Sequence, residues 1–474
     1  FEKWDLPWAQ IGVVTDTGQM VVKNHGQIVA DIPTRKLANE APIYHRESRE
    51  PGYLKTVREF TLGKIPDTND PVADLKTLLA WPTIASKSWV YRQYDHTVRA
   101  CSVIRPGSDA AVLRIKEDSL PPIPQNPHSA LRTPHSERFI ALTVDCNAVY
   151  VYLDPYEGGK IAVAEAARNL ACTGATPLGI TDNLNFGNPH NPEIFYQLQK
   201  SVEGLAEACR VFEVPVTGGN VSLYNQSPAG PIDPTPTVAM VGLIEKPEHI
   251  TTQWFKDEGD VIILLGEGIN SEDPLLGLGG SAYLQRIHGL KTGLPPRCDL
   301  AQERGLHDAV RALIRSGLIK SAHDCSEGGL AVALAECCVS QQVPRDTPRL
   351  MGAEMDLTLL ESGEPETSRS RASRSQVSNS RLEIRGQTAP AGSSSEIRLD
   401  AWLFGETQSR VIISASASNA EEVLQCARRS SITASRLGTV GGAALKIRLS
   451  GGELTWDLRE LHDLWWNSIA RAMK

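Results

Sequence analysis

The stretch GKIAVAEAARNLACTGATPLGITDNLNF, residues 159–186, decides the fold that the sequence predicts. Its first part has the apolar spacing of a helix, whose buried face we assign to Ile161, Ala164, Ala167 and Ala171. Gly174 follows at the position where a glycine commonly ends a helix. The apolar run PLGI then predicts a buried strand that leads into polar residues. A helix followed directly by a strand indicates an α/β fold.

The same alternation continues on both sides of this stretch. Strands are expected at AAVLRI (110–115), FIALTVDC (139–146) and TVAMVGLIE (237–245), and a helix at 193–211. We assign these elements to one domain, residues 100–248. A second core begins at DVIILLG (260–266), which places a second domain at 255–450 and a terminal strand and helix at 451–474. Inside it, residues 362–396 are rich in Ser and Arg, and we expect a disordered insertion because few large apolar side chains are available to bury.

The sequence also repeats itself. Residues 11–37 align with residues 437–463 without a gap, so that Gly12, Gly26 and Asp31 meet Gly438, Gly452 and Asp457. Both segments predict three short strands separated by turns. We interpret the repeat as a duplication. Residues 1–40 would then be the β-rich tail of a preceding copy, residues 41–99 a connector with helices (one expected from Asp70 to Leu79), and the chain the back part of a longer protein.

The composition excludes several classes of protein. The chain has 48 basic and 56 acidic residues, a net charge of −8, and 41% hydrophobic residues. This balance argues against a nucleic-acid partner, and no apolar run is long enough for a membrane span. The nine cysteines include no C-x-x-C pair, so neither a zinc site nor a disulfide framework is indicated. We expect buried, reduced thiols in a cytoplasmic protein.

The common nucleotide and hydrolase motifs are absent from the sequence. There is no phosphate-binding G-x-x-x-x-G-K-[ST] loop, and LLGLGGSAY (275–283) has the wrong glycine spacing for a dinucleotide fingerprint. There is also no G-x-S-x-G or H-E-x-x-H motif. The chemistry must therefore be sought in less common polar segments.

Two polar segments follow apolar strands in the first domain. In TDNLNFGNP (181–189), Asp182 could present a carboxylate to a metal–phosphate group, or the segment could be a capping turn rich in Asn. In VTGGNVSLYN (216–225), the backbone of Gly218 and Gly219 could approach an anion, with Asn220 as an oxygen ligand and Ser222 as a hydroxyl; a plain glycine turn is the alternative. Together they predict one phosphate and metal site at the ends of two strands.

A third segment, SAHDCSEGGLAVALAECC (321–338), lies in the second domain. Ser326 and Glu327 have the character of a helix start, and the Ala, Leu and Val residues that follow predict a core helix. His323 and Asp324 could act in catalysis, although capping and packing account for most of the segment. We favour the structural interpretation.

Taken together, these segments resemble the second half of the phosphoribosylformylglycinamidine synthase family. The resemblance rests on TDNLNFGNP, TGGNVSLYN (217–225), AHDCSEGGLAVALAE (322–336) and LFGETQSR (403–410), and on YHRESREP (44–51) and YDHTVR (94–99) in the middle region. The family belongs to a superfamily with aminoimidazole ribonucleotide synthetase and selenophosphate synthetase. It implies a PurM-like ATP-binding N-domain and a PurM-like C-terminal domain, a pair that occurs twice in the full synthetase.

The resemblance implies an ATP-dependent C–N ligase of purine biosynthesis that uses ATP and Mg²⁺. ATP would phosphorylate the formyl amide oxygen of formylglycinamide ribonucleotide, and ammonia from a glutaminase subunit (PurQ), assembled with a small PurS subunit, would displace the phosphate. By motif position, Asp182 and Gly219 would bind ATP, Asn220 the magnesium ion and Ser222 the ribonucleotide. LFGETQSR would correspond to a substrate-binding segment of the other half. Asn183 stands where the family usually has cysteine, and in an extended strand its side chain should point away from Asp182.

The family's catalytic residues lie in its first half, so the resemblance implies no catalytic residue in this chain and no turnover by it alone. Two alternatives remain open. One is a homodimeric two-domain enzyme of the same superfamily, against which the connector at 38–95 argues. The other is a non-catalytic structural half that keeps a bound nucleotide.

Overall fold

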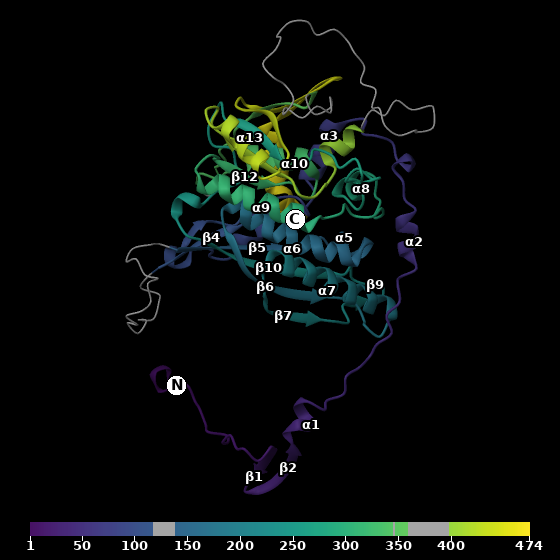
Figure 1. The fold of residues 1–474 in the computed structure, drawn as a ribbon, viewed down its shortest axis with the longest axis vertical. Coiled ribbons are helices and arrows are strands. Elements are labelled where there is room, and N and C mark those ends of the chain that lie inside the picture. Colours follow the sequence, from purple (N-terminus) through teal and green to yellow (C-terminus); the bar gives the residue numbers. More distant parts are fainter. Residues whose placement is uncertain (117–137, 345–346, 359–397) are drawn as a thin grey trace. The chain divides into compact units, whose positions relative to one another are not determined.

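The computed structural model describes residues 1–116, 138–344, 347–358 and 398–474 (Figure 1). These residues form two compact units, Phe1–Glu47 and Ser48–Lys474. The insertion expected at 362–396 lies outside the described residues. None of the nine cysteines, all within the described ranges, forms a disulfide. Over the same ranges, no helix combines the length and apolarity that crossing a bilayer requires.

The first unit is a hairpin followed by a short helix. It contains a 3₁₀ turn (Glu2–Trp4), the antiparallel strands β1 (Gln19–Asn24) and β2 (Gln27–Pro33), and α1 (Thr34–Ala38). The strand predicted near residues 11–14 is wrong, because the chain has no regular structure there. The aligned residues 437–440 do form a strand, since they pair with strands on both sides, and no such partners exist among residues 1–47.

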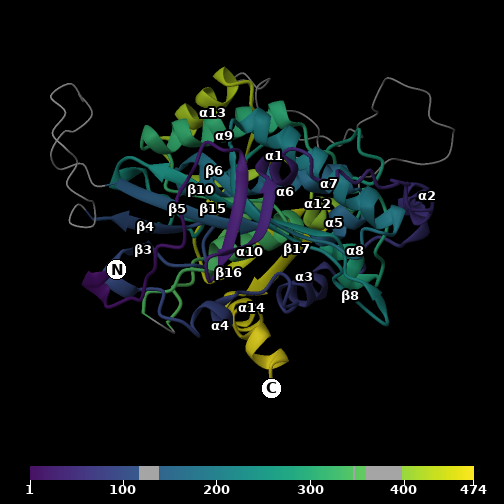
Figure 2. The same cartoon turned by 90° about the horizontal axis from the view of Figure 1, so that it is seen from below.

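The second unit opens with the connector helices α2 (Tyr53–Arg58), α3 (Pro71–Leu79) and α4 (Ser88–Tyr91), with 3₁₀ turns at Leu62–Lys64 and Val98–Ala100. The helix expected from Asp70 is confirmed, and the Asp70 carboxylate accepts a hydrogen bond from the Ala73 amide (3.0 Å) as its N-cap. Leu75, Leu78 and Leu79 of α3 are fully buried. Figure 2 shows α3, α4 and α14 (Leu458–Ala472) gathered near the C-terminus. From Ser48 on, the connector therefore packs as part of the second unit.

A six-stranded sheet forms the first domain of this unit, in the order β3-β4-β5-β10-β6-β7. Its strands are β3 (Ser102–Ile104), β4 (Ala111–Ile115), β5 (Arg138–Asp145), β6 (Thr176–Asn185), β7 (Val216–Ser222) and β10 (Thr235–Ile244), with a small hairpin of β8 (Gln226–Ser227) and β9 (Gly230–Pro231). All pairs in the sheet are antiparallel except β6 with β7. β7 is an edge strand.

The helices of this domain are α5 (Ala148–Leu153), α6 (Pro155–Thr173) and α7 (Pro192–Phe212), so the helix predicted at 193–211 is confirmed. α6 ends at Gly174, whose φ of 92° is the left-handed conformation that glycine tolerates. The face assigned to Ile161, Ala164, Ala167 and Ala171 is buried as expected, but burial extends to nearly every residue of the helix. α7 and the sheet cover one side of α6, and α9 (Leu300–Arg315) and β12 (Ser321–Asp324) cover its other side (Figure 1).

The second domain is built on a seven-stranded sheet in the order β12-β14-β11-β15-β13-β16-β17. Its other strands are β11 (Val261–Leu265), β13 (Ala353–Asp356), β14 (Val411–Ala415), β15 (Ala434–Val440), β16 (Ala444–Leu449) and β17 (Gly452–Asp457). α9 and α13 (Ala420–Arg429) pack on one face. α10 (Gly329–Val339), α12 (Leu399–Phe404) and α14 pack on the other, with α8 (Ala282–Ile287) and a 3₁₀ turn at Pro247–His249 in the connections. This mixture of helices and sheets confirms the predicted α/β class.

Candidate functional site

The two polar segments of the first domain begin inside strands, and only residues 186–189 and 223–225 follow them. Asp182 belongs to β6, and Gly219, Asn220 and Ser222 belong to β7. The strands run parallel, which puts Asp182 opposite Gly219 and Asn183 opposite Asn220. We call these five residues the edge set. The alternative of a turn does not hold for Asp182, Gly219 and Asn220, because pairing between β6 and β7 outweighs the low strand preference of glycine and asparagine.

Asp182 and Asn220 lie on opposite faces of the sheet. A Cβ added at Gly219 would collide with the Asp182 carboxylate, so that side chain lies over Gly219 on the face that α7 covers. Side chains alternate along a strand, and Asn220 therefore points to the other face, where its amide donates a hydrogen bond to Asn183 Oδ1 (3.2 Å). The expectation that one metal–phosphate group contacts both Asp182 and Asn220 side chains does not fit this arrangement.

Asn183 has a larger place in the edge set than the sequence indicated. We expected its side chain to point away from Asp182, which is what the structure shows. That direction brings it onto Asn220, however, so it shares a face with the residue for which a metal ligand was predicted. Ser222 lies two residues further along β7 on the same face, and its hydroxyl is 3.3 Å from Asn225 Oδ1. Asn183, Asn220 and Ser222 thus form a row of amide and hydroxyl groups beside an open strand edge.

A second group of polar side chains lies where α6 meets the second domain. We call it the buried charge set: Asp145, Glu165, Arg168, Glu303, Asp324 and Glu327. Arg168 is fully buried and forms ion pairs with Glu303 and, at 3.5 Å, with Asp324. Its third contact is a hydrogen bond to the Ser326 hydroxyl (3.3 Å). The guanidinium therefore joins α6 to α9 and to the end of β12.

Negative charge exceeds positive charge in the buried charge set. Burial raises the pKa of Glu165 well above its usual value, and the neighbouring carboxylates of Glu327, Asp145 and Asp324 raise it further. Burial likewise raises the pKa of Asp145 to about 7. Glu303 behaves in the opposite way: burial acts to raise its pKa, but Arg168 and His307 lower it to about 2. The Arg168 guanidinium thus compensates Glu303 and contacts Asp324, while Glu165 and Asp145 keep raised pKa values.

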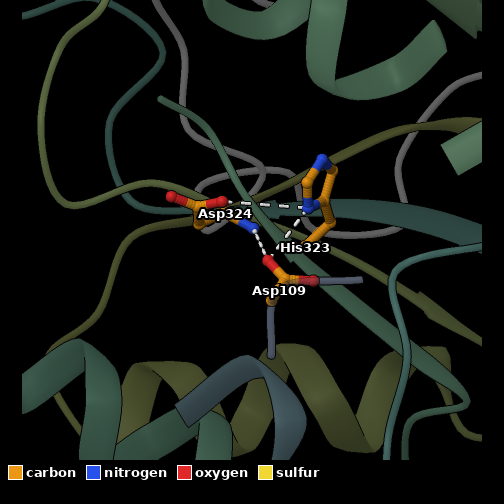
Figure 3. Close-up of side chains that lie close together, drawn as sticks. All are labelled: Asp109, His323 and Asp324. Atoms are coloured by element: carbon orange, nitrogen blue, oxygen red, sulfur yellow. Dashed lines mark hydrogen bonds and ion pairs between the residues drawn. The ribbon is translucent and has the colours of Figure 1, made fainter. Parts of the chain in front are cut away.

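A further cluster, Asp109, His323 and Asp324, lies beside this set (Figure 3). Its oxygen and nitrogen atoms are close enough together to hold a metal ion. Both ring nitrogens of His323 already face carboxylates, however: Nδ1 lies 2.9 Å from Asp109 and Nε2 lies 3.1 Å from Glu336. Although burial opposes it, these two acids raise the pKa of His323 well above its usual value. A protonated imidazole cannot ligate a metal, and we assign His323 to an ion-pair network between the two domains.

The structure also changes two expectations for the second domain. Ser326 does not cap α10, whose N-cap is Gly328; its hydroxyl donates instead to Asp324. The LFGETQSR segment is buried throughout. Glu406 accepts hydrogen bonds from the amides of Ala282 (2.8 Å) and Gly328 (2.7 Å), and Arg410 donates only to backbone carbonyls. Both charged side chains of that segment are therefore occupied by the fold.

Sequence reasoning missed Glu165 and Arg168, although a signal was present. Both stand within an otherwise apolar helix, together with Asn169, whose amide donates to Asp145 Oδ1 (2.9 Å). Charged residues are rarely buried unless they are paired or bind a ligand. What identifies Glu165 and Arg168 as unusual is that they are charged residues in a helix that is buried on almost all sides. Only the tertiary structure shows this burial.

Comparison with known proteins identifies the class. The family model "AIR synthase related protein, N-terminal domain" matches residues 107–244, and its C-terminal counterpart matches residues 257–449. These ranges contain the six-stranded and the seven-stranded sheet almost completely. The chain belongs to the AIR synthase related proteins.

Within this class the chain is similar to phosphoribosylformylglycinamidine synthase subunit PurL, which confirms the resemblance found in its motifs. It is 41% identical over 472 residues to the protein of Moorella thermoacetica, covering 99% of this chain and 55% of the relative. It is also 41% identical over 475 residues to the protein of Anaeromyxobacter sp. (strain K), covering 100% of this chain and 55% of the relative. The chain thus spans about half the length of the curated relatives it matches.

Solved structures agree on the fold. Thermotoga maritima PurL complexed with FGAR superposes with a TM-score of 0.53 at 17% identity, covering 86% of this chain and 56% of that one. T. maritima PurL complexed with AMPPCP gives a TM-score of 0.51 at 16% identity, covering 86% and 53%. At such identity the likeness concerns the arrangement of the chain alone.

Proposed function

We propose that this chain forms one wall of the nucleotide site of a phosphoribosylformylglycinamidine synthase. The reaction would convert formylglycinamide ribonucleotide, ATP and glutamine-derived ammonia to the amidine, ADP and phosphate. A glutaminase subunit and a small third subunit would complete the assembly in the cytoplasm. The 41% identity to PurL proteins over the whole chain supports the reaction class, and PurL of T. maritima has been solved with FGAR and with AMPPCP.

The observation that carries this proposal is the open face of β6 and β7. An edge strand leaves backbone amides without a partner on one side, and Gly218 and Gly219 put no side chain in front of them. Asn220 and Ser222 add an amide and a hydroxyl beside that edge. β7 is exposed along almost its whole length and buries little of its own, so binding an anionic ligand is the better account of its composition.

Magnesium would be held in this wall mainly by the nucleotide. The groups of the edge set that share the face of Asn220 are amides and a hydroxyl, and the Asp182 carboxylate lies on the other face. Mg²⁺ is commonly bound through phosphate oxygens with one or two protein oxygens, which a row of this kind fits. The ion, when bound, would neutralise charge on the transferring phosphate. Asn220 would orient it through the amide oxygen, and Asp182 would fix the spacing of β6 and β7 by packing over Gly219.

Substitutions in the natural protein that contains this chain test the proposal. Asn220→Ala and Asp182→Ala are each expected to lower ATP-dependent amidine formation about 10- to 100-fold, as loss of positioning groups does. Glu245→Gln is the matched control, because Glu245 is an exposed acid just after β10, outside the edge set. Near-normal turnover in both edge variants would contradict the proposal.

The buried charge set favours a second function, that of a structural nucleotide site. Asp145, Glu165, Asn169 and Asp324 bring oxygen atoms into one buried region in which the pKa values of Asp145 and Glu165 are raised. A divalent cation there would offset the negative charge of the carboxylates, and bound nucleotide phosphates would fill its remaining positions. On this account the chain binds one nucleotide for chemistry at the edge set and another for stability between its own two domains.

A further inference from the structure

A cavity of about 610 Å³ lies apart from both polar sets, where the connector meets the two domains. It is lined by the chain that follows α4, by the turn after β3, and by residues of α10's exit and of α14. α4 and α14 contact each other beside it (Figure 2). Its volume is that of a small-molecule site, and such sites are common at domain junctions.

Aromatic rings form the walls of this cavity. Trp465 and Trp466 lie with ring centroids 6.2 Å apart, and Tyr91 meets His96 edge-on at 5.5 Å. Trp465 is fixed by a hydrogen bond from its indole to Glu336 (3.1 Å), and the exposed Tyr94 ring completes the lining. Flat rings held in this way present faces and edges on which a planar ligand can stack.

The charge of the cavity is positive. Arg92 and Arg105 both line it, and the Arg92 guanidinium lies 5.8 Å from the Trp466 ring centre. Burial raises the pKa of Tyr91, and the positive charges of Arg105 and Arg92 act against that rise. The one carboxylate of the lining, Asp95, is already bonded to the backbone and hydroxyl of Thr97 (both 2.8 Å).

Two polar side chains of the lining have unused hydrogen-bonding atoms. Ser340 is 4% exposed, and its hydroxyl has no hydrogen-bond partner among the described residues. Gln342 donates its amide to His462 (3.1 Å), but its Oε1 atom is buried without a partner in the same ranges. Buried polar atoms are nearly always bonded, and a polar ligand in the cavity would supply what these two lack.

We propose that this cavity binds a small planar heteroaromatic ring that carries an anionic group. The ring stacks among Tyr91, Tyr94 and Trp466, the anion meets Arg105, and ring or sugar polar atoms bond Ser340 and Gln342. Mononucleotides and aromatic carboxylates both have this chemistry. The site is separate from the edge set and from the buried charge set, so it is independent of the proposed function.

Isothermal titration of the 474-residue chain with AMP, checked by tryptophan fluorescence, tests the proposal. AMP is expected to bind, whereas adenosine and ribose 5-phosphate, which lack the charge or the ring, should bind at least about tenfold more weakly. Arg105→Ala and Tyr94→Ala should each weaken AMP binding about tenfold or more. Both side chains are exposed, so these variants should fold. Arg210→Ala, an exposed arginine of α7, is the matched control.

The outcomes separate this site from the others. AMP binding that is lost in Asn220→Ala or Glu165→Gln but kept in Arg105→Ala and Tyr94→Ala would place the nucleotide elsewhere and overturn the proposal. Absence of both heat and fluorescence change at millimolar AMP and millimolar indole-3-acetate would overturn it as well. Binding of indole-3-acetate more tightly than AMP, with the same dependence on Arg105 and Tyr94, would support the site and identify its occupant as an aromatic carboxylate.

Discussion

The edge set and the buried charge set show two ways in which one domain uses polar residues. Asn183, Gly219 and Asn220 lie in exposed strands, where their polar groups remain in water and cost the fold little. Glu165 and Arg168 lie in a helix that is buried on almost all sides, where a charged side chain is either paired, as Arg168 is, or has a shifted pKa, as Glu165 has. The comparison teaches that the first set is free to serve a ligand, whereas the second must first serve the fold.

Removing the central cation should give the largest effect. Arg168→Leu leaves Glu303 and Asp324 buried without their guanidinium, and breaking a buried ion pair in this way costs about 3–5 kcal/mol of unfolding free energy. Urea unfolding followed by tryptophan fluorescence measures it. Arg210→Leu on the exposed end of α7 is the control and should change stability by less than about 0.5 kcal/mol. Equal losses of unfolding free energy in the two variants would mean that Arg168 contributes no more to stability than an exposed arginine does.

Binding of MgADP sharpens the comparison, because it asks which set holds the nucleotide in the chain by itself. At a concentration 100 times its dissociation constant, the ligand should stabilise the folded chain by about 2.7 kcal/mol. Glu165→Gln should abolish most of this gain if the buried charge set binds it, and Asn220→Ala should leave it intact. Thermal unfolding with and without MgADP gives the answer, and the reverse pattern would assign the nucleotide to the edge.

The pH dependence of stability should show a smaller effect. Burial, reinforced by Glu327, raises the pKa of Glu406 from 4.5 to about 8. The folded state therefore holds a proton that the unfolded state releases, so this contribution is complete below pH 4.5 and is lost as the pH rises toward 8. The slope is at most about 1.4 kcal/mol per pH unit. Glu406→Gln should reduce the pH dependence of the free energy of unfolding between pH 5 and 8. An unchanged pH dependence in this variant would contradict the raised pKa of Glu406.

The regular elements could be predicted because local patterns determine them. α6 with its glycine end, α7, α3 with its Asp70 cap and the apolar β11 all follow from periodicity and capping. That Gly219 and Asn220 lie in a strand could not be predicted, since it results from their pairing with β6. The motifs identified the residues of the edge set. Which of them lie on which face of the sheet could be decided only from the register between β6 and β7.

The buried charge set escaped prediction for a different reason. Arg168 and Glu303 are 135 residues apart in the sequence, and nothing local indicates that they meet. Burial of a charged side chain is decided by what packs over it, here α9 and β12 from the second domain. The apolar periodicity of a single sequence distinguishes a buried face of a helix from an exposed one, and α6 has almost no exposed face.

The hairpin of the first unit has a practical consequence for handling the protein. Met20, Val22, Ile28 and Val29 are all at least 46% exposed, and no other strand among the described residues pairs with β1 or β2. Two open edges with branched apolar side chains invite strand addition from a second molecule. Aggregation at high protein concentration should therefore depend on the first unit, Phe1–Glu47. A preparation of residues 48–474 is expected to remain monodisperse at concentrations at which the 474-residue chain aggregates.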